Sequence, residues 1–148
     1  MVYKGIERRT CIRFEIPGST LNYKREKTFL PEGKYSEEFC PILDISRGGL
    51  RFLTQEEIKM NTFITMQISL PGERIPLEMK GQIKWAAVNA GKSYKHQVGV
   101  QFSPYGEKKG QNYPGSLVKI IALEQKFAPT EKGDNDNSEK GDFEIDSE

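Results

Sequence analysis

Alternating apolar and polar residues predict β-strands over most of this chain. The most regular alternation covers residues 64–70, and after the turn residues Pro71 and Gly72 it resumes over residues 75–85. A third run, residues 94–102, continues the pattern in phase. A period of two is typical of a half-buried antiparallel strand. These three strands are therefore expected to form consecutive hairpins. Trp85 lies at the end of an apolar face, which favours a place in the core over a role as a stacking platform.

The first half of the chain carries shorter and less regular runs. They predict strands at residues 6–17, 21–29, 39–45 and 50–53, followed by a single helical turn at residues 55–59. Thr10, Ile12, Phe14 and Ile16 alternate with polar or small neighbours in the first of these strands, whose entry is basic. The pattern is typical of a strand that buries one face.

The pattern changes to a helical one near the end of the chain. Apolar residues recur three and four positions apart within residues 116–127, and Ser116 is expected to be the N-cap. Residues 128–148 carry eight acidic residues and two lysines, with few apolar side chains. Such a segment cannot bury enough surface to offset its ordering entropy, so we expect a disordered tail. The folded domain is expected to span residues 1–127.

Several short antiparallel strands and one terminal helix favour a small β-barrel. A closed barrel leaves no exposed strand edges, which short strands would otherwise present to other chains. We therefore expect a mostly β fold: a six- to seven-stranded antiparallel barrel of the split-barrel kind with a C-terminal helix.

Composition and charge limit the protein to a few classes. The chain has 148 residues, 36% of them hydrophobic, which suits one domain rather than two. The net charge of +1 combines about −6 for the tail with about +7 for the body. No apolar run reaches the roughly 20 residues of a membrane span, and the N-terminus does not resemble a secretion signal. We expect a cytoplasmic protein whose two cysteines, Cys11 and Cys40, are reduced.

The hexapeptide Asp44-Ile45-Ser46-Arg47-Gly48-Gly49 is a candidate binding loop. Asp44 and Ser46 share one side of an extended chain, and the glycine pair is expected to supply a positive-φ turn and a close backbone approach. The same residue types also build ordinary tight turns. The hexapeptide alone therefore does not decide between a site and a turn.

Three arginines near the N-terminus favour the binding interpretation. Arg8, Arg9 and Arg13 lie on a predicted extended segment, where Arg9 and Arg13 would share one side with their Cα atoms about 13 Å apart. A guanidinium group binds phosphate or the O6/N7 edge of guanine in bidentate fashion and stacks on purines. Taken alone, such a trio also fits a solvated face or a general nucleic-acid patch.

Together the two elements resemble those of PilZ domains. Residues 9–13 match the RxxxR element, preceded by Arg8, and residues 44–49 match the [D/N]xSxxG element. The resemblance extends over residues 7–127, and residues 81–85 and 98–102 also look like later strands of the family. It implies a receptor for cyclic di-GMP.

The resemblance also implies the residue roles. Arg9 and Arg13, assisted by Arg8, would hold phosphates and guanines from an N-terminal arm. Asp44 and Ser46 would contact a guanine on the barrel, and Gly48 and Gly49 would permit close approach. The implied protein is a stand-alone receptor or adaptor without cofactor or metal. Ordering of its arm would signal to a protein effector in motility, adhesion or biofilm control.

Other interpretations have weaker support in the sequence. Residues 86–93 fit a relaxed phosphate-loop pattern, but a strand rather than a helix is predicted to follow them. His96 is the only histidine and lies in phase on a strand, which favours a structural role over catalysis. We expect no enzyme and no zinc site. The alternative function is a barrel that binds proteins or single-stranded nucleic acid without binding cyclic di-GMP; under the receptor interpretation nucleic acid is not a partner.

Overall fold

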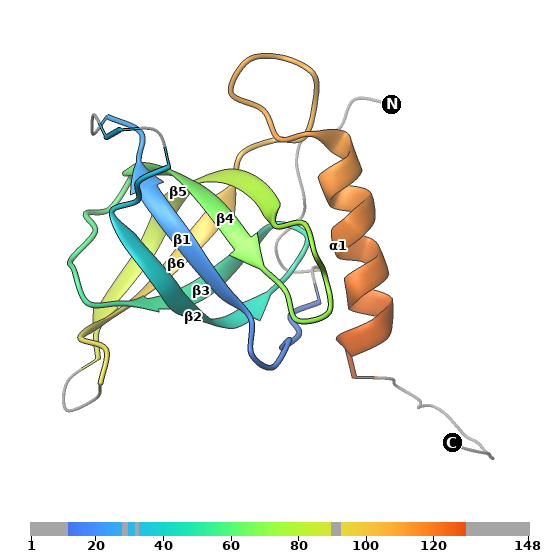
Figure 1. The fold of residues 1–148 in the computed structure, drawn as a ribbon, viewed down its shortest axis with the longest axis horizontal. Helices are drawn as coiled ribbons and strands as arrows, with labels where there is room; N and C mark the ends of the chain where they lie inside the picture. Colours follow the sequence, from blue (N-terminus) through green and yellow to red (C-terminus); the bar gives the residue numbers. More distant parts are fainter. Residues whose placement is uncertain (1–11, 28–29, 32, 90–92, 130–148) are drawn as a thin grey trace.

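The computed structural model describes residues 12–27, 30–31, 33–89 and 93–129, which fold into a β-barrel with one helix (Figure 1). The elements are β1 (Thr20–Arg25), β2 (Glu37–Ile45), β3 (Gly49–Thr54), β4 (Phe63–Ser69), β5 (Leu77–Val88), β6 (His96–Phe102) and α1 (Pro114–Phe127). All strand pairs are antiparallel, and the barrel closes in the order β1-β2-β3-β6-β5-β4. The expected barrel with a C-terminal helix is confirmed.

Alternation along the strands fills the barrel interior. In β4, Ile64, Met66 and Ile68 are fully buried, whereas the residues between them are partly exposed. Tyr23 of β1 and Phe52 of β3 meet inside the barrel with their ring centroids 5.7 Å apart. Among the described residues, the interior is therefore an apolar core of packed side chains.

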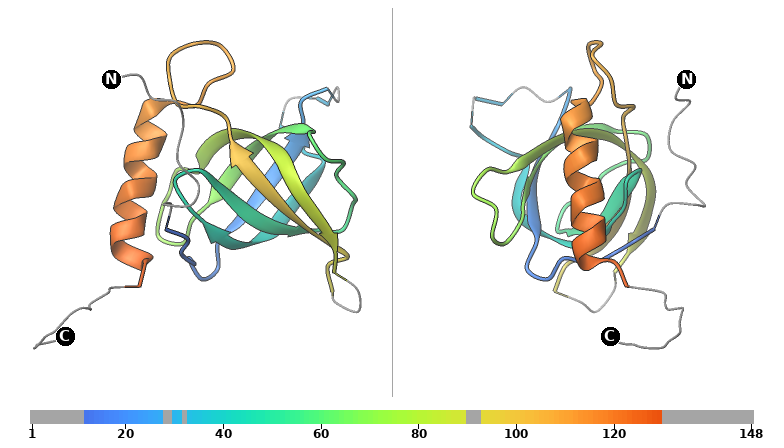
Figure 2. Two further views of the ribbon diagram at one scale, coloured as in Figure 1. Left: turned by 180° about the vertical axis from the view of Figure 1, so that it is seen from behind. Right: turned by 90° about the vertical axis from the view of Figure 1, so that its right-hand side faces the viewer.

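Helix α1 lies across one open end of the barrel (Figure 2). Its residues Ile120 and Leu123 are buried in the same core cluster as the strand residues, so the helix covers the apolar interior at that end. Within the described residues, no helix is long and apolar enough to cross a membrane.

The helix begins earlier than the sequence suggested, and Ser116 is not its N-cap. Tyr113 occupies the cap position without a side-chain cap bond, and Pro114 follows it. Proline suits the first helical position because its φ is already helical and its missing N–H leaves no donor unsatisfied. Ser116 is instead a buried residue of the first turn, where its N–H donates to the Tyr113 carbonyl at 2.9 Å.

Two further expectations about local structure are wrong. Residues 12–17 form no strand; Phe14 alone makes a bridge, exchanging N–H···O bonds of 3.0 and 2.9 Å with Ile45. Pro17 and Gly18, which has a φ of +83°, then turn the chain into β1. Residues 55–59 form no helical turn; within this stretch the Glu56 carbonyl accepts from the Thr54 hydroxyl at 2.6 Å, and the Gln55 N–H donates to a Glu37 carboxylate at 2.8 Å. Residues 6–11 lie outside the described residues.

Trp85 is not in the core. The β5–β6 register shifts between Ile83, which faces Val100, and Trp85, which faces Gly99. A one-residue irregularity moves the following side chains to the other face of a sheet. Trp85 therefore lies on the outer wall with 44% of its surface exposed.

Cys40 is a buried free thiol on β2. Burial, followed by the negative charges of Glu37 and Glu56, raises the pKa of this thiol from 9.0 to about 12. Cys11 lies outside the described residues, as do residues 130–148, for which disorder was expected.

We therefore expect the Cys40 thiol to resist alkylation in the folded protein. In a Cys11→Ser variant, N-ethylmaleimide at neutral pH should modify Cys40 roughly a hundredfold more slowly in the folded than in the urea-unfolded chain, as followed by mass spectrometry. Because the folded pKa is raised, the protonated thiol favours the folded state below pH 9.0, and this contribution is lost as the pH rises to about 12. Equal rates in both states would contradict the burial of Cys40.

Candidate functional site

The turn between β2 and β3 is built from the polar hexapeptide itself. The Ser46 N–H donates to the Gly49 carbonyl at 2.8 Å, and the Gly48 N–H donates to the Ser46 hydroxyl at 3.2 Å. Ser46 is buried. Its hydroxyl therefore stabilises the turn, as serine commonly does in such motifs.

Only one of the two properties expected of the glycine pair is found. Neither Gly48 nor Gly49 is among the glycines with positive φ, so the expected positive-φ turn is wrong. The hydrogen bonds of Ser46 with Gly48 and Gly49 close the turn without a positive φ. The close approach does occur, but against β6: a Cβ on Gly49 would lie 2.0 Å from the Val100 carbonyl oxygen. Gly49 thus lets β3 and β6 pair tightly beside the turn.

Asp44 joins two arginines that come from different parts of the chain. Arg51 of β3 donates from Nε to Oδ1 and Oδ2 at 3.2 and 3.0 Å, and from Nη2 to Oδ2 at 2.5 Å. Arg13 donates from Nη1 to Oδ1 at 3.3 Å. Asp44 is only 7% exposed, so its carboxylate is almost fully engaged by these donors. The hydrogen bond to Asp44 raises the pKa of the Arg51 guanidinium, and burial lowers it by a smaller amount.

A cleft of about 470 Å³ lies beside this cluster on the outer wall. Arg13, Arg51 and Lys84 supply three cations to its lining, and Trp85 supplies an aromatic surface. The remaining lining residues are Leu50, Gly99 and Val100. Gly99 faces Trp85 across the β5–β6 pair, and a Cβ on Gly99 would lie 3.6 Å from Cε3 of the indole, so the tryptophan side chain lies beside this glycine. The cleft combines positive charge with a stacking platform, which is what an anionic aromatic ligand requires.

The structure brings some of the sequence-predicted residues together. Arg13 and Asp44 are in direct contact, and Ser46, Gly48 and Gly49 form the adjoining turn. Arg8 and Arg9 lie outside the described residues.

Sequence reasoning did not identify Arg51 and Lys84 as cations of the cleft, and it favoured the core over a stacking role for Trp85. One signal for Arg51 was present: a tight turn at residues 46–48 makes Asp44 and Arg51 cross-strand partners, as observed. Opposite charges at such positions stabilise an antiparallel pair.

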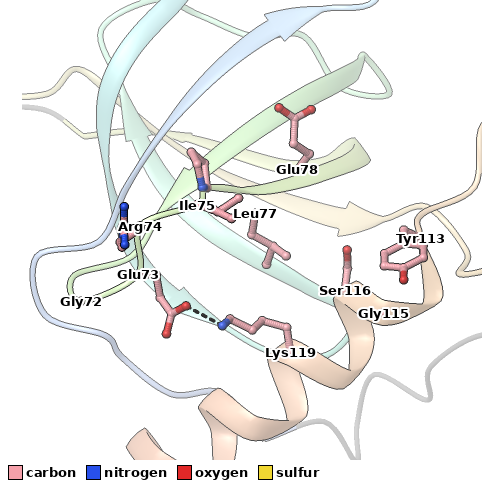
Figure 3. A pocket seen from close by; sticks show the side chains of 11 residues that line it. Gly72, Glu73, Arg74, Ile75, Leu77, Glu78, Tyr113, Gly115, Ser116 and Lys119 are labelled. Atoms are coloured by element: carbon pink, nitrogen blue, oxygen red, sulfur yellow. Dashed lines mark hydrogen bonds and ion pairs between the residues drawn. The ribbon is translucent and has the colours of Figure 1, made fainter.

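A second hollow, of about 670 Å³, lies between the β4–β5 loop and the first half of α1 (Figure 3). Its charged side chains are balanced: Glu73 and Lys119 form an ion pair at 2.5 Å across it, and Arg74 and Glu78 add one charge of each sign. This hollow therefore lacks the excess of cations seen beside Asp44. No group of three metal-ligating side chains occurs in the described part of the chain.

Residues 7–113 match the family model of the PilZ domain. The chain belongs to the PilZ domain family. Among solved structures, the fold is similar to that of the Bacillus subtilis inhibitor of motility, MotI/DgrA, with a TM-score of 0.57 and 15% sequence identity. The likeness covers 82% of this chain and 51% of MotI/DgrA, so this PilZ chain spans about half the length of that protein. A comparison with curated protein sequences gave no significant match.

We expect Gly49→Ala to destabilise the fold strongly. The new Cβ would clash with the Val100 carbonyl, which cannot move without separating β3 from β6. We expect the substitution to lower the free energy of unfolding by about 3 kcal/mol. Gly99→Ala is the matched control on the facing strand, because the nearest atom to its Cβ lies 3.4 Å away. Urea denaturation should show a change within about 0.5 kcal/mol for this control. Similar losses in both variants would contradict the close approach.

Proposed function

We propose that this PilZ domain is a non-enzymatic receptor for cyclic di-GMP, which it binds in the cleft beside Asp44. The proposal is carried by one observation: a buried carboxylate fixes Arg13 and Arg51 at the edge of a cleft that also contains Lys84 and Trp85. Membership of the PilZ family, whose domains bind cyclic di-GMP, supports the same ligand.

The chemistry of the cleft suits both parts of this ligand. Cyclic di-GMP carries two phosphate charges and two guanines. Guanidinium groups bind phosphate oxygens and the O6/N7 edge of guanine through paired donors, which an ammonium group cannot do. The exposed face of Trp85 offers a surface on which a guanine can stack. The cleft volume lies within the about 300–1,000 Å³ that is common for small-ligand sites.

Asp44 has a different role in this proposal from the one expected. Arg13 and Arg51 already engage the Asp44 carboxylate. Asp44 therefore orients these two donors instead of contacting a guanine directly. Ser46 likewise acts through the turn, with Gly48 and Gly49 shaping the backbone next to the cleft.

The N-terminal arm is the second half of the proposed clamp. Phe14 bridges Ile45, next to the turn, and Arg13, one residue earlier, lines the cleft. Arg9 is four residues from Arg13, within about 13 Å of extended chain, and can therefore reach a ligand there together with Arg8. Ordering of this arm on binding would present a new surface to a protein effector.

The proposed output is adaptor signalling in the cytoplasm. MotI/DgrA is named as an inhibitor of motility, which makes control of motility one candidate output, and biofilm control is another that the family suggests. A receptor of this kind performs no catalytic step. The effector would instead recognise the ligand-bound arrangement of the domain.

One observation also favours the alternative function. Three cations around an exposed tryptophan equally fit single-stranded nucleic acid, in which bases stack and phosphates need charge. A titration with both ligand classes separates the two functions.

We expect isothermal calorimetry to show binding of cyclic di-GMP and weaker binding to two cleft variants. Arg13→Ala removes a donor, and Asp44→Ala releases both arginines from their fixed positions. Each should lower the affinity by about tenfold or more, as expected for the loss of a paired contact worth about 1–3 kcal/mol.

Arg74→Ala is the matched control for this titration. It also removes one guanidinium, but Arg74 lines the second hollow and is not part of the cleft. The affinity of this variant for cyclic di-GMP should equal that of the wild-type protein. If the wild-type protein bound an oligothymidylate but no cyclic di-GMP, the receptor function would be wrong and the nucleic-acid function would be supported.

We further expect Trp85 to report the ligand directly. It is the only tryptophan, so stacking of a guanine should quench the intrinsic fluorescence in proportion to occupancy. Trp85→Leu should weaken binding by about tenfold, since a base–aromatic stack is worth about 1–3 kcal/mol. An unchanged emission spectrum at saturating cyclic di-GMP would exclude Trp85 as a stacking surface.

A further inference from the structure

Arg47, in the centre of the turn, is bound to a buried carboxylate of α1. Its Nε donates to Oε1 of Glu124 at 2.9 Å, and its Nη2 donates to Oε2 at 3.4 Å. Glu124 is only 8% exposed. The two residues are 77 positions apart in the chain, so the pair ties the candidate binding turn to the second half of the helix.

A second bond holds the same turn from the segment that leads into α1. The Tyr105 hydroxyl donates to the Arg47 carbonyl at 2.7 Å. Tyr105 belongs to the connection between β6 and α1, which is closed by a bridge between Tyr105 and Asn112. Side chain and backbone of Arg47 are thus both held by one continuous segment, residues 105–124.

Packing of the helix alone does not require this ion pair. Ile120 and Leu123 already bury apolar surface against the core. A partly buried ion pair gains little net stability over an apolar pair of similar size, because both charges lose hydration. A forked arginine–carboxylate pair does fix one relative geometry of its two elements. The Arg47–Glu124 pair is therefore better explained by positioning than by stability.

We propose that the Arg47–Glu124 pair couples occupancy of the cleft to the docking of α1. The turn follows directly after Asp44, which orients the two arginines of the cleft. A ligand that holds these arginines in place also holds the turn, and the turn holds α1 through Glu124. Glu124 is a positioning residue that acts through Arg47. The inference rests on the proposed cyclic di-GMP site and adds the route by which that site reaches another surface.

The coupling has to act in both directions. If α1 docking strengthens ligand binding by some factor, the ligand strengthens α1 docking by the same factor. Helix α1 also forms one wall of the second hollow, where Lys119 meets Glu73 (Figure 3). Tighter docking therefore changes a surface distinct from the ligand cleft.

The first test compares two Glu→Gln variants by calorimetry with cyclic di-GMP. Glu124→Gln breaks the pair with the turn and should weaken binding by about five- to thirtyfold, within the usual range of coupling between sites. Glu73→Gln removes a second ion pair of α1, the more exposed pair with Lys119, and should change the affinity by less than about twofold. A purely structural role for Glu124 would lower the melting temperature but leave the affinity unchanged, and that result would overturn the proposal.

Arg47→Lys provides a second variant with a milder change. It keeps the positive charge and loses the fork, so it should show part of the loss caused by Glu124→Gln. A lysine variant with wild-type affinity would contradict the need for a fixed geometry. This variant remains informative if Glu124→Gln does not fold.

Amide hydrogen exchange separates the coupling from the receptor function. In the wild-type protein, cyclic di-GMP should slow exchange in the second half of α1, and in Glu124→Gln it should not. Without any ligand, Glu124→Gln should speed exchange of the Ser46 and Gly48 amides, which the turn protects. If the wild-type protein binds no cyclic di-GMP, the receptor function fails, whereas unchanged ligand-free exchange at the turn overturns the coupling itself.

Discussion

The site depends on one buried carboxylate that two arginines share. Asp44 is almost inaccessible to water, and a buried charge is tolerated only when it is paired. Arg51 supplies the paired donors from the neighbouring strand, and Arg13 adds one from the segment before the barrel. Without the carboxylate these two cations would repel each other across a small distance. The positive lining of the cleft therefore depends on a buried negative charge beside it, which holds Arg13 and Arg51 in place.

Irregularities of the barrel, rather than its regular parts, place the site on its surface. Buried apolar side chains of the described strands pack the interior, and the cleft beside Asp44 lies on the outer wall. Gly49 lets β3 approach β6 closely beside the turn, and the register shift after Ile83 turns Trp85 from the interior to the outer wall. Bulges commonly redirect side chains near functional sites in this way. The same closed sheet that stabilises the fold thus presents an aromatic ring next to three cations.

The fold was predictable because its strands follow a local rule, whereas much of the site was not. Alternation along residues 64–70 reports burial directly, and the arginine and Asp44 motifs identified two side chains that do meet. Arg51 was missed because its relation to Asp44 depends on the length of a turn. Trp85 was assigned to the core because a register shift of one residue leaves no trace in the alternation. The helix start was misplaced because Pro114, and not a serine cap, determines it. Pairing between strands decides these features, and pairing is not a local property.

A receptor needs parts that differ between its free and bound states, and a closed barrel offers few of them. Among the described residues, the candidates are the segment around Phe14 and helix α1, which lie outside the six barrel strands. Phe14 exchanges a pair of backbone hydrogen bonds with Ile45, and Glu124 of α1 binds Arg47, two residues further on. Both attachments therefore converge on the turn that follows Asp44. Under the proposed coupling, a ligand that stabilises this turn would act on the segment around Phe14 and on the helix together, because both contact the same turn.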